Sequence, residues 1–214
     1  MRSNYLPTDY QNFIALSRYA RWREDDQRRE NWGETVDRYF NYMENHLKTN
    51  HSYTITKALK DKLNDMITSL GVMPSMRALM TAGPALDRCH VGGYNCSYIP
   101  VDSPRAFDEC MYVLMCGTGV GFSVEREVVD KLPIVNEHME QSTTVIHVGD
   151  SRPGWSKALR ELIAVLYAGQ IPTWDVSQVR PAGVVVGGVR RSALISLSNL
   201  GDDQMRHAKS GQWW

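Results

Sequence analysis

The sequence lacks the features that mark a membrane or secreted protein. No run of apolar residues in the 214-residue chain approaches the length needed to cross a bilayer. The N-terminal stretch MRSNYLPTDYQNF has no apolar core of the kind a secretory signal peptide carries. These absences predict a cytoplasmic protein with no membrane partner. The length allows one large domain or somewhat more.

An excess of charge of either sign is also missing. The chain has 24 Lys and Arg residues against 24 Asp and Glu residues, so its formal net charge is zero. This balance argues against a nucleic-acid partner that is bound by phosphate neutralisation. The stretch RYARWREDDQRRENW mixes both signs, and we interpret it as a solvated helical face or a local ion-pair cluster.

Cysteine is scarce, and its spacing does not suit zinc. The four cysteines are Cys89, Cys96, Cys110 and Cys116. No C-x2-C or H-x3-H pattern accompanies them, so we expect no metal site. Stable disulfides are not expected in a cytoplasmic protein, whereas a transient, catalytic one remains open.

The first 72 residues show helical spacing, and we expect a helical N-terminal region there. The stretch WGETVDRYFNYMENHL is one predicted helix, and TITKALKDKLNDMITSLG is a second that should stop at Gly71. Their apolar positions at helical spacing are Val36, Tyr39, Phe40 and Met43 in the first, and Ile55, Leu59, Leu63, Met66 and Ile67 in the second.

From Pro74 onward, short apolar runs alternate with helical stretches. CSYIPV and GVGFSVE read as strands, and VVVGGVRRSALISLSNL is strand-like. SPRAFDECMYVLMC reads as a helix with Ser103 as N-cap and Pro104 at its first position. DSRPGWSKALRELIAVLYAG reads as a turn and a helix that stops at Gly169. This alternation predicts an α/β fold with mainly parallel strand pairing over residues 73–214.

Two short stretches could contact a nucleotide. Gly117, Gly119 and Gly121 follow a helix and precede a strand, which is the reverse of the order in a dinucleotide-binding fingerprint. A tight turn is the more typical interpretation, and a nucleotide-contacting turn remains open. Ser75, after Pro74, could donate to an anion, although such a pair more often caps a helix.

Cys96 stands in polar surroundings. The Gly92–Gly93 turn precedes it, and Asn95 and Ser97 flank it. This setting suits a thiol that faces a cleft, where its reactivity depends on its thiolate fraction. A buried cysteine that packs as a small apolar side chain is the alternative.

Several long motifs resemble one enzyme family. They are SRYARWREDDQRRENWGETVDRY, MPSMRALMTAGPALDRCHVGGYNCSYIPVDSPRAFDECMYVLMCGTGVGFSVE, DSRPGWSKAL and VVVGGVRRSALISLSNLGDDQMRHAKSGQWW. Over nearly the whole chain the sequence resembles adenosylcobalamin-dependent (class II) ribonucleotide reductases, in particular the monomeric triphosphate-reductase type. Class I reductases share the early cysteine, but the longer motifs favour the cobalamin type.

The resemblance implies a fold and a reaction. The fold would be a helical N-terminal region followed by the first part of a ten-stranded α/β barrel built from two five-stranded half-sheets. The reaction would reduce ribonucleoside triphosphates to 2′-deoxyribonucleoside triphosphates for DNA synthesis. Adenosylcobalamin would generate a thiyl radical on one cysteine. Two other cysteines would supply the reducing equivalents and end as a disulfide, which thioredoxin or a similar dithiol restores.

The resemblance also implies roles for individual residues. Cys96 matches the first of the two reducing cysteines. Ser75 matches a contact to the substrate phosphate, and Asn95 and Gly117 lie where the family contacts substrate. A deoxynucleotide effector would bind in a region that includes Asp102, Ser103, Val124, Glu125, Arg126 and Asp150.

The sequence departs from the family in two ways. The thiyl cysteine, the second reducing cysteine, and the catalytic asparagine and glutamate of the family have no match here. Cys89, Cys110 and Cys116 do not take those roles, and we expect Cys110 and Cys116 to pack. In addition, VRPAG runs directly into VVVGGVRRSA, so a stretch of the family is missing between Gly183 and Val184.

These departures separate the family's reaction from the activity of this chain. We expect the chain alone to be inactive unless a second chain supplies the rest of the barrel. A non-catalytic fragment that binds nucleotide or effector, and a non-functional remnant, both remain open.

Overall fold

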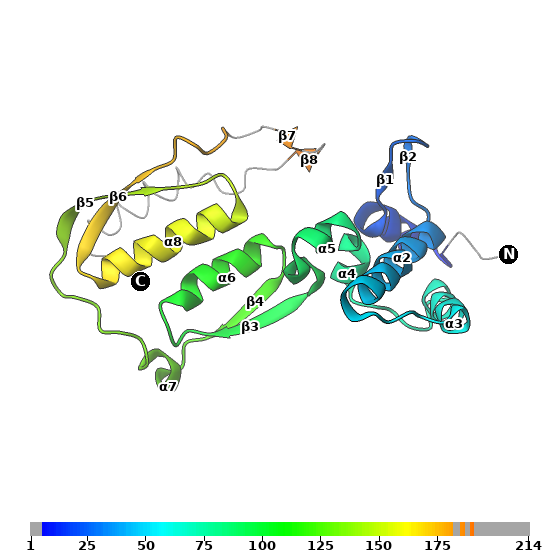
Figure 1. The fold of residues 1–214 in the computed structure, drawn as a ribbon, viewed down its shortest axis with the longest axis horizontal. Coiled ribbons are helices and arrows are strands. Elements are labelled where there is room, and N and C mark those ends of the chain that lie inside the picture. The colour runs from blue at the N-terminus through cyan, green and yellow to red at the C-terminus, as the bar shows by residue number, and fades with distance from the viewer. Residues whose placement is uncertain (1–5, 182–184, 187–188, 191–214) are drawn as a thin grey trace. The chain divides into compact units, whose positions relative to one another are not determined.

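A computed structural model describes residues 6–181, 185–186 and 189–190 of the chain (Figure 1). The chain divides into two compact units, Met1–Val135 and Asn136–Trp214. The helical part of the first unit contains α1 (Asp9–Ile14), the π-helix η1 (Ala15–Tyr19), the short strands β1 (Trp22–Arg23) and β2 (Arg28–Arg29), α2 (Trp32–His51) and α3 (Lys57–Thr68). It continues with α4 (Met76–Thr81), α5 (Pro84–Arg88), the 3-10 helix η2 (His90–Gly93), β3 (Cys96–Pro100), α6 (Arg105–Met115), β4 (Gly119–Ser123) and α7 (Arg126–Val129). The second unit contains β5 (Glu140–His147), α8 (Arg152–Tyr167), β6 (Gln170–Asp175), β7 (Val185–Val186) and β8 (Val189–Arg190).

The predicted helix over WGETVDRYFNYMENHL is confirmed as α2, the longest helix of the described residues. Asn31 and Glu34 form a capping box at its start, in which each side chain accepts from the other residue's backbone N–H. Val36 and Phe40 are buried in the main apolar core together with Leu79 of α4. This core therefore joins residues on both sides of the expected boundary at residue 72.

The second predicted helix is confirmed as α3, but its face and its end differ from the prediction. Of its apolar residues, Ile67 is buried, whereas Leu59, Leu63 and Met66 are exposed. The helix ends in a Schellman motif, in which Gly71 N–H donates to Met66 O at 2.9 Å and Leu70 N–H donates to Ile67 O at 3.0 Å. Leu70, with a φ of 62°, takes the left-handed position that the prediction gave to Gly71.

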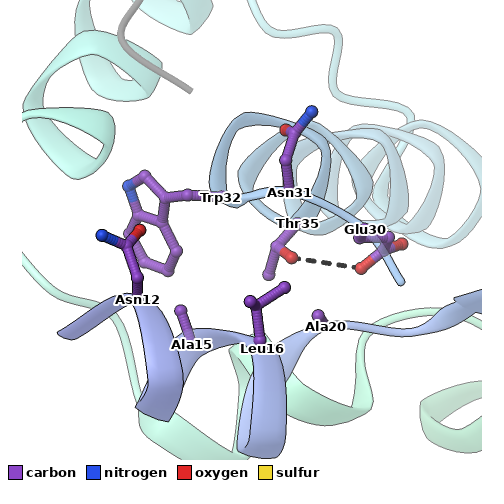
Figure 2. Close-up of a pocket in the computed structure, with 8 residues that line it drawn as sticks. All are labelled: Asn12, Ala15, Leu16, Ala20, Glu30, Asn31, Trp32 and Thr35. Atoms are coloured by element: carbon purple, nitrogen blue, oxygen red, sulfur yellow. Dashed lines mark hydrogen bonds between the residues drawn. The ribbon is translucent and has the colours of Figure 1, made fainter. Parts of the chain in front are cut away.

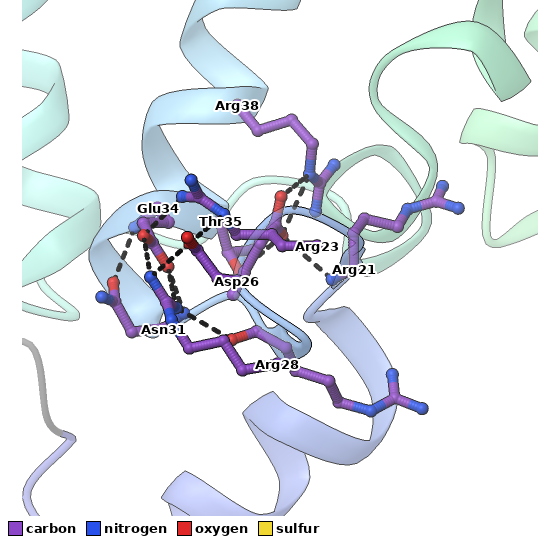
Figure 3. A network of polar contacts seen from close by, with 10 residues as sticks. Arg21, Arg23, Asp26, Arg28, Asn31, Glu34, Thr35 and Arg38 are labelled. Carbon is purple, nitrogen blue, oxygen red and sulfur yellow. Dashed lines mark hydrogen bonds and ion pairs between the residues drawn. The ribbon is translucent and has the colours of Figure 1, made fainter.

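The mixed-charge stretch is a β-hairpin and not a helical face. Trp22 pairs with Arg29 and Arg23 with Arg28 in antiparallel register. The alternative interpretation, a local ion-pair cluster, is confirmed (Figure 3). Arg28 and Arg23 both reach Glu34, the carboxylate that caps α2, at 2.8 Å and 2.6 Å. The hairpin thereby fixes the start of α2.

The α/β part of the first unit is a parallel strand pair with a helix packed on it. β3 and β4 run parallel, from Cys96 opposite Gly119 to Pro100 opposite Ser123. α6, the helix that connects them, packs on both strands, as βαβ units do. The predicted strands and helix are therefore confirmed. The predicted cap is off by one residue, because Pro104 occupies the N-cap position, makes no side-chain bond there, and leaves Ser103 outside the helix.

The second unit repeats this arrangement. β5 and β6 pair in parallel, with a register irregularity between Gln141 and Val145, and α8 packs on both strands. Ile146, Val148 and Ala158 form the core between helix and strands. Ser151 caps α8, which is followed by Ala168 and then Gly169 at a φ of 77°, as predicted. The expected mainly parallel α/β pattern is confirmed in both units.

The strands of the described residues form two-stranded sheets, and they do not by themselves outline a barrel. β7 and β8 pair antiparallel within the predicted strand-like stretch VVVGGVRRSALISLSNL, and the other residues of that stretch lie outside the described residues. Among the described residues, no helix is both long and apolar enough to span a membrane.

Candidate functional site

Cys96 is the first residue of β3 and lies opposite Gly119 of β4. Its side chain is exposed and its thiol is free. Alternate residues of β3 face opposite sides of the strand. Cys96, Tyr98 and Pro100 therefore share the exposed face. The thiol is thus open to a partner.

Ser75 and Asn95 lie together next to this strand end. Ser75 is the N-cap of α4, where its Oγ accepts from Ala78 N–H at 3.4 Å and donates to Gly93 O at 3.0 Å. Asn95 Oδ1 lies 3.5 Å from Ser75 Oγ and accepts from the backbone N–H of Arg77 at 3.1 Å. Ser75 therefore is a helix cap, as the local sequence favours, and its exposed hydroxyl also lies beside the residue that precedes Cys96.

Arg77, which the sequence patterns did not single out, joins Gly117 to this group. Its Nη2 donates to Cys116 O at 2.8 Å and its Nε donates to Gly92 O at 3.2 Å. Gly117 has a φ of 88°, and a Cβ at this position would lie 2.3 Å from Arg77 Nη2. Glycine is needed here both for the backbone conformation and for the space that the guanidinium fills. The signal in the sequence was a cation two residues after Ser75 in PSMRALM.

The charge of Arg77 has no carboxylate partner among the described contacts, which pair its guanidinium with carbonyl oxygens only. Together, Ser75, Asn95, Arg77 and Gly117 form a cluster at the amino end of the β3–β4 pair, beside Cys96. We call these four residues the strand-end cluster. A hydroxyl, an amide and a cation near one another are groups that bind a phosphate.

Most of the expected effector residues gather at the opposite end of the same strand pair. Asp102 and Ser103 follow β3, and Val124 follows β4. The backbone N–H of Val101 donates to Ser123 O at 3.0 Å, which holds the carboxyl ends of β3 and β4 side by side. Glu125 and Arg126 come next, as the N-cap and first residue of α7. A five-residue strand separates the two ends by about 13 Å.

Asp150 belongs to the second unit, so the structure does not place it against these residues. Its carboxylate forms an ion pair with Arg180 of the same unit. Arg180 Nη2 donates to Asp150 Oδ1 at 3.2 Å.

The other three cysteines lie in or directly after helices and not on β3. Cys110 is half-buried within α6, and Cys116 is buried at the end of that helix. Cys89, at the end of α5, is half-buried, and its Sγ lies 3.4 Å from Cys116 Sγ. Within the described residues, no three His, Cys, Asp or Glu side chains are arranged to hold a metal ion.

A pocket in the N-terminal helices does not involve any expected site residue (Figure 2). Its volume is about 120 Å³, and its lining residues are Asn12, Ala15, Leu16, Ala20, Glu30, Asn31, Trp32 and Thr35. Glu30 is held on its wall by Thr35 Oγ1 at 3.1 Å and by Arg38 Nε at 2.9 Å. The carboxylate is therefore occupied by structural contacts, and we do not assign the pocket a role.

Comparison with known proteins gives a consistent relationship. A family model described as "Ribonucleotide reductase alpha domain" matches residues 3–84. The adenosylcobalamin-dependent ribonucleoside-triphosphate reductase of Lactobacillus leichmannii is 25% identical over 232 residues, covering 79% of this chain and 31% of that protein. The enzyme of the same name from Lacticaseibacillus paracasei is 28% identical over 240 residues, covering 79% of this chain and 32% of that protein. The chain is similar to the N-terminal portion of a class II ribonucleotide reductase.

The fold agrees with this relationship. The crystal structure of a B12-dependent (class II) ribonucleotide reductase matches with a TM-score of 0.69 at 24% identity, covering 85% of this chain and 34% of that one. The mixed helix and strand arrangement is therefore that of a class II reductase over the matched part.

The chain spans about a third of the length of the reductases it matches. The alignments extend over more positions than the matched share of the 214 residues contains, so these reductases carry additional residues within the matched region. A stretch missing between Gly183 and Val184, as the sequence predicts, would produce such a difference.

Proposed function

We propose that the chain is the N-terminal portion of an enzyme that reduces ribonucleoside triphosphates to 2′-deoxyribonucleoside triphosphates. The observation that carries this proposal is the exposed thiol of Cys96 at the start of β3, beside the strand-end cluster. Relatives bear the name of such a reductase, which supports the reaction class.

In this proposal Cys96 supplies reducing equivalents to the ribose. Its thiol loses a hydrogen and finally forms a disulfide with a second cysteine outside this chain. Exposure on a strand suits this task, because the sulfur must approach substrate and afterwards another sulfur. Thioredoxin or a similar dithiol would reduce the disulfide by thiol exchange.

The strand-end cluster would hold the substrate. Ser75 Oγ and the guanidinium of Arg77 would contact the triphosphate, and Asn95 would contact the nucleotide next to Cys96. The support for this is the shared contact network of Ser75, Asn95 and Arg77, and the close approach of Gly117 that keeps Arg77 in place. Charge-assisted bonds from arginine to phosphate are the strongest of these contacts.

A deoxynucleotide effector would bind at the carboxyl end of the β3–β4 pair, with Asp102, Ser103, Val124, Glu125 and Arg126. Ligands of parallel sheets commonly bind beyond the carboxyl ends of the strands, which supports this placement. Asp150, which lies in the second unit, stays a predicted effector residue and is not included in this placement. Substrate and effector would then lie at opposite ends of one strand pair.

The remaining parts of the enzyme follow from the same proposal. Residues 1–72 would be the helical N-terminal region, and residues 73–214 would belong to the first part of a ten-stranded α/β barrel. Adenosylcobalamin, when bound, would supply the radical, and we assign none of the described residues to hold it. A cytoplasmic location would suit four cysteines of which none is in a disulfide.

The test is turnover in a protein that joins this chain to the remaining part of a class II reductase. With thioredoxin recycling, Cys96→Ser should abolish multiple turnover, because a serine hydroxyl cannot donate the electrons or close a disulfide. Cys110→Ser, at a half-buried helical position, should keep turnover and is the matched control. Normal turnover of Cys96→Ser together with loss in Cys110→Ser would refute the assignment.

A further inference from the structure

Two cysteines outside the proposed reaction lie within reach of each other. Cys89 follows α5 and precedes η2, and Cys116 follows α6, so the two residues come from different segments of the first unit. Their sulfur atoms are 3.4 Å apart, and neither cysteine is in a disulfide. The hydroxyl of Tyr112, one turn earlier on α6, lies 3.6 Å from Cys89 Sγ.

The two thiols differ in accessibility. Cys116 is only 5% exposed, whereas Cys89 is half-buried. A small reagent can therefore reach Cys89 first, with Cys116 directly behind it. The described residues offer no third ligand that would turn this pair into a metal site.

The surroundings of Cys89 favour its thiolate. Burial by itself would raise the pKa of the Cys89 thiol, but hydrogen bonds from Tyr112, Cys116 and the backbone N–H groups of Gly92 and Val91 outweigh burial and lower the pKa. The same contact with Cys89 raises the pKa of Tyr112 to about 12, so the phenol keeps its proton and can donate a hydrogen bond to the Cys89 thiolate. The thiolate is the form of cysteine that attacks oxidants.

We propose that Cys89 and Cys116 are a redox modification site that closes to a reversible disulfide when a small peroxide oxidises Cys89. The Cys89 thiolate attacks one peroxide oxygen, the O–O bond breaks, and Cys89 becomes a sulfenic acid while the other oxygen leaves as water after taking up a proton. The sulfur of Cys116 then attacks Cys89 Sγ and the S–O bond breaks. The Cys116 proton leaves with the sulfenic oxygen as a second water. The two thiols together lose two electrons, and the peroxide gains them.

The backbone around the pair is already held in place for this bond. Thr118 Oγ1, just after Cys116, donates to Val91 O at 2.8 Å and to Tyr94 O at 3.0 Å. Arg77 links Gly92 O to Cys116 O from the other side. Since the segments are tied at these points, a disulfide needs the sulfur atoms to approach by only about 1.4 Å.

The disulfide would fix a part of the strand-end cluster. Cys116 supplies the carbonyl that Arg77 Nη2 binds, and Gly117 follows directly. The cross-link would hold this carbonyl against the segment of Gly92, so the oxidised chain should resist unfolding more than the reduced chain. This modification is independent of the proposed reductase reaction, since neither Cys89 nor Cys116 takes part in it.

The experiment treats the 214-residue chain with hydrogen peroxide and maps its cysteines by mass spectrometry. Trypsin followed by chymotrypsin separates Cys89 from Cys96 at Tyr94, and Cys110 from Cys116 at Tyr112. We expect a linked pair of peptides that holds Cys89 and Cys116, with a mass lower by about two hydrogens, which a dithiol separates. The linked chain should show a melting temperature several degrees higher than the reduced chain.

Variants separate the proposal from unspecific oxidation. Cys116→Ser should lose both the linked peptides and the gain in melting temperature, whereas Cys110→Ser should keep both. Tyr112→Phe should move the pH midpoint of Cys89 alkylation upward, because the thiolate loses a donor. If peroxide gives Cys89 sulfinic acid without a link, or links Cys89 to Cys96, the proposal is wrong. Should Cys116→Ser fail to fold, the peptide map of the unaltered chain still decides the question.

Discussion

At the scale of single residues, the guanidinium of Arg77 organises the strand-end cluster. It donates to the backbone carbonyl groups of Gly92 and Cys116. The backbone N–H of Arg77 donates to the side chain of Asn95. Its described contacts leave its positive charge available for an anion. The cluster therefore depends on one cation and on the glycine that leaves room for it.

The first prediction is that Gly117→Ala weakens binding of a ribonucleoside triphosphate. The new Cβ would lie 2.3 Å from Arg77 Nη2 and would displace the guanidinium. Loss of one charge-assisted bond predicts a dissociation constant about tenfold higher, or more. Isothermal titration calorimetry of the chain with a ribonucleoside triphosphate measures this dissociation constant.

Gly121→Ala is the matched control for this prediction. It lies on β4 with its nearest neighbour atom at 3.8 Å, so a Cβ fits there and affinity should stay unchanged. Equal affinities for Gly117→Ala, Gly121→Ala and the unaltered chain would show that Arg77 does not bind phosphate.

The second prediction concerns acid sensitivity at Glu34. Its hydrogen bond with Arg28, ahead of its other contacts, lowers the pKa of the carboxyl from 4.5 to about 2. A group with a depressed folded pKa contributes stability above pH 4.5, and this contribution is lost as the pH falls toward 2. Because the side chain is 26% exposed, solvent screening keeps the contribution small.

Glu34→Gln tests this reasoning. Glutamine keeps an oxygen for capping α2 but cannot carry the charge. We expect a lower melting temperature at neutral pH and a shallower decline between pH 4.5 and 2 than in the unaltered chain. The test measures the melting temperatures of Glu34→Gln and of the unaltered chain across this pH range. An identical decline in both chains would contradict the prediction.

At the scale of helices and strands, the close contact before α8 decides how that helix begins. Gly154 is the third residue of α8, and its N–H donates to the capping Ser151 Oγ at 3.0 Å. A Cβ at Gly154 would lie 2.3 Å from the carbonyl oxygen of Gly149. This oxygen belongs to the backbone, so it cannot turn aside as a side-chain atom would.

The third prediction is that Gly154→Ala destabilises the second unit by about 1–3 kcal/mol, the usual cost of overpacking. Gly149→Ala is the matched control, since its Cβ would meet Gly154 Cα at an ordinary 3.6 Å. Chemical denaturation measures the free energy of unfolding of both variants. Equal stability of both would show that the turn relaxes without cost.

The predictions from sequence succeeded where local patterns dominate. Helical spacing found α2 and α3, and the alternation of apolar runs with helices found β3, α6, β4 and α8. They failed where a distant contact overrides a local preference. Leu70 takes the left-handed position at the end of α3 although Gly71 was available, and Leu70 also packs against the main core, which accounts for the exchange.

The candidate site was only partly predictable for the same reason. Ser75, Asn95 and Gly117 follow from the family resemblance, and the structure brings them together. Arg77 was missed, because its role lies in contacts to Gly92 and Cys116, which are distant in sequence. The Cys89–Cys116 pair was missed in the same way, since no spacing rule predicts that the ends of α5 and α6 meet.

At the scale of the whole molecule, the main core does not stop where the sequence texture changes. Leu79, from the region after residue 72, is fully buried with Val36, Phe40 and Ile67. Arg38 of α2 also donates to Leu79 O at 3.2 Å and to Ala82 O at 2.9 Å. The helical region therefore depends on α4 for both apolar and polar contacts.

The last prediction is that residues 1–135 fold as an isolated fragment, whereas residues 1–72 do not. The shorter fragment loses Leu79, whose burial contributes about 1.5–3 kcal/mol, and it leaves the Arg38 donors without their carbonyl partners. Since domains are stable by only about 5–15 kcal/mol, these losses remove much of the margin. Circular dichroism during heating should show one cooperative transition for residues 1–135 and a gradual decline for residues 1–72. Leu79→Ala within residues 1–135 is the matched control, and its transition should stay cooperative at a lower temperature. If residues 1–72 melt cooperatively at the temperature of the longer fragment, the boundary lies at residue 72, and the core contacts made by α4 contribute nothing to the stability of the helical region.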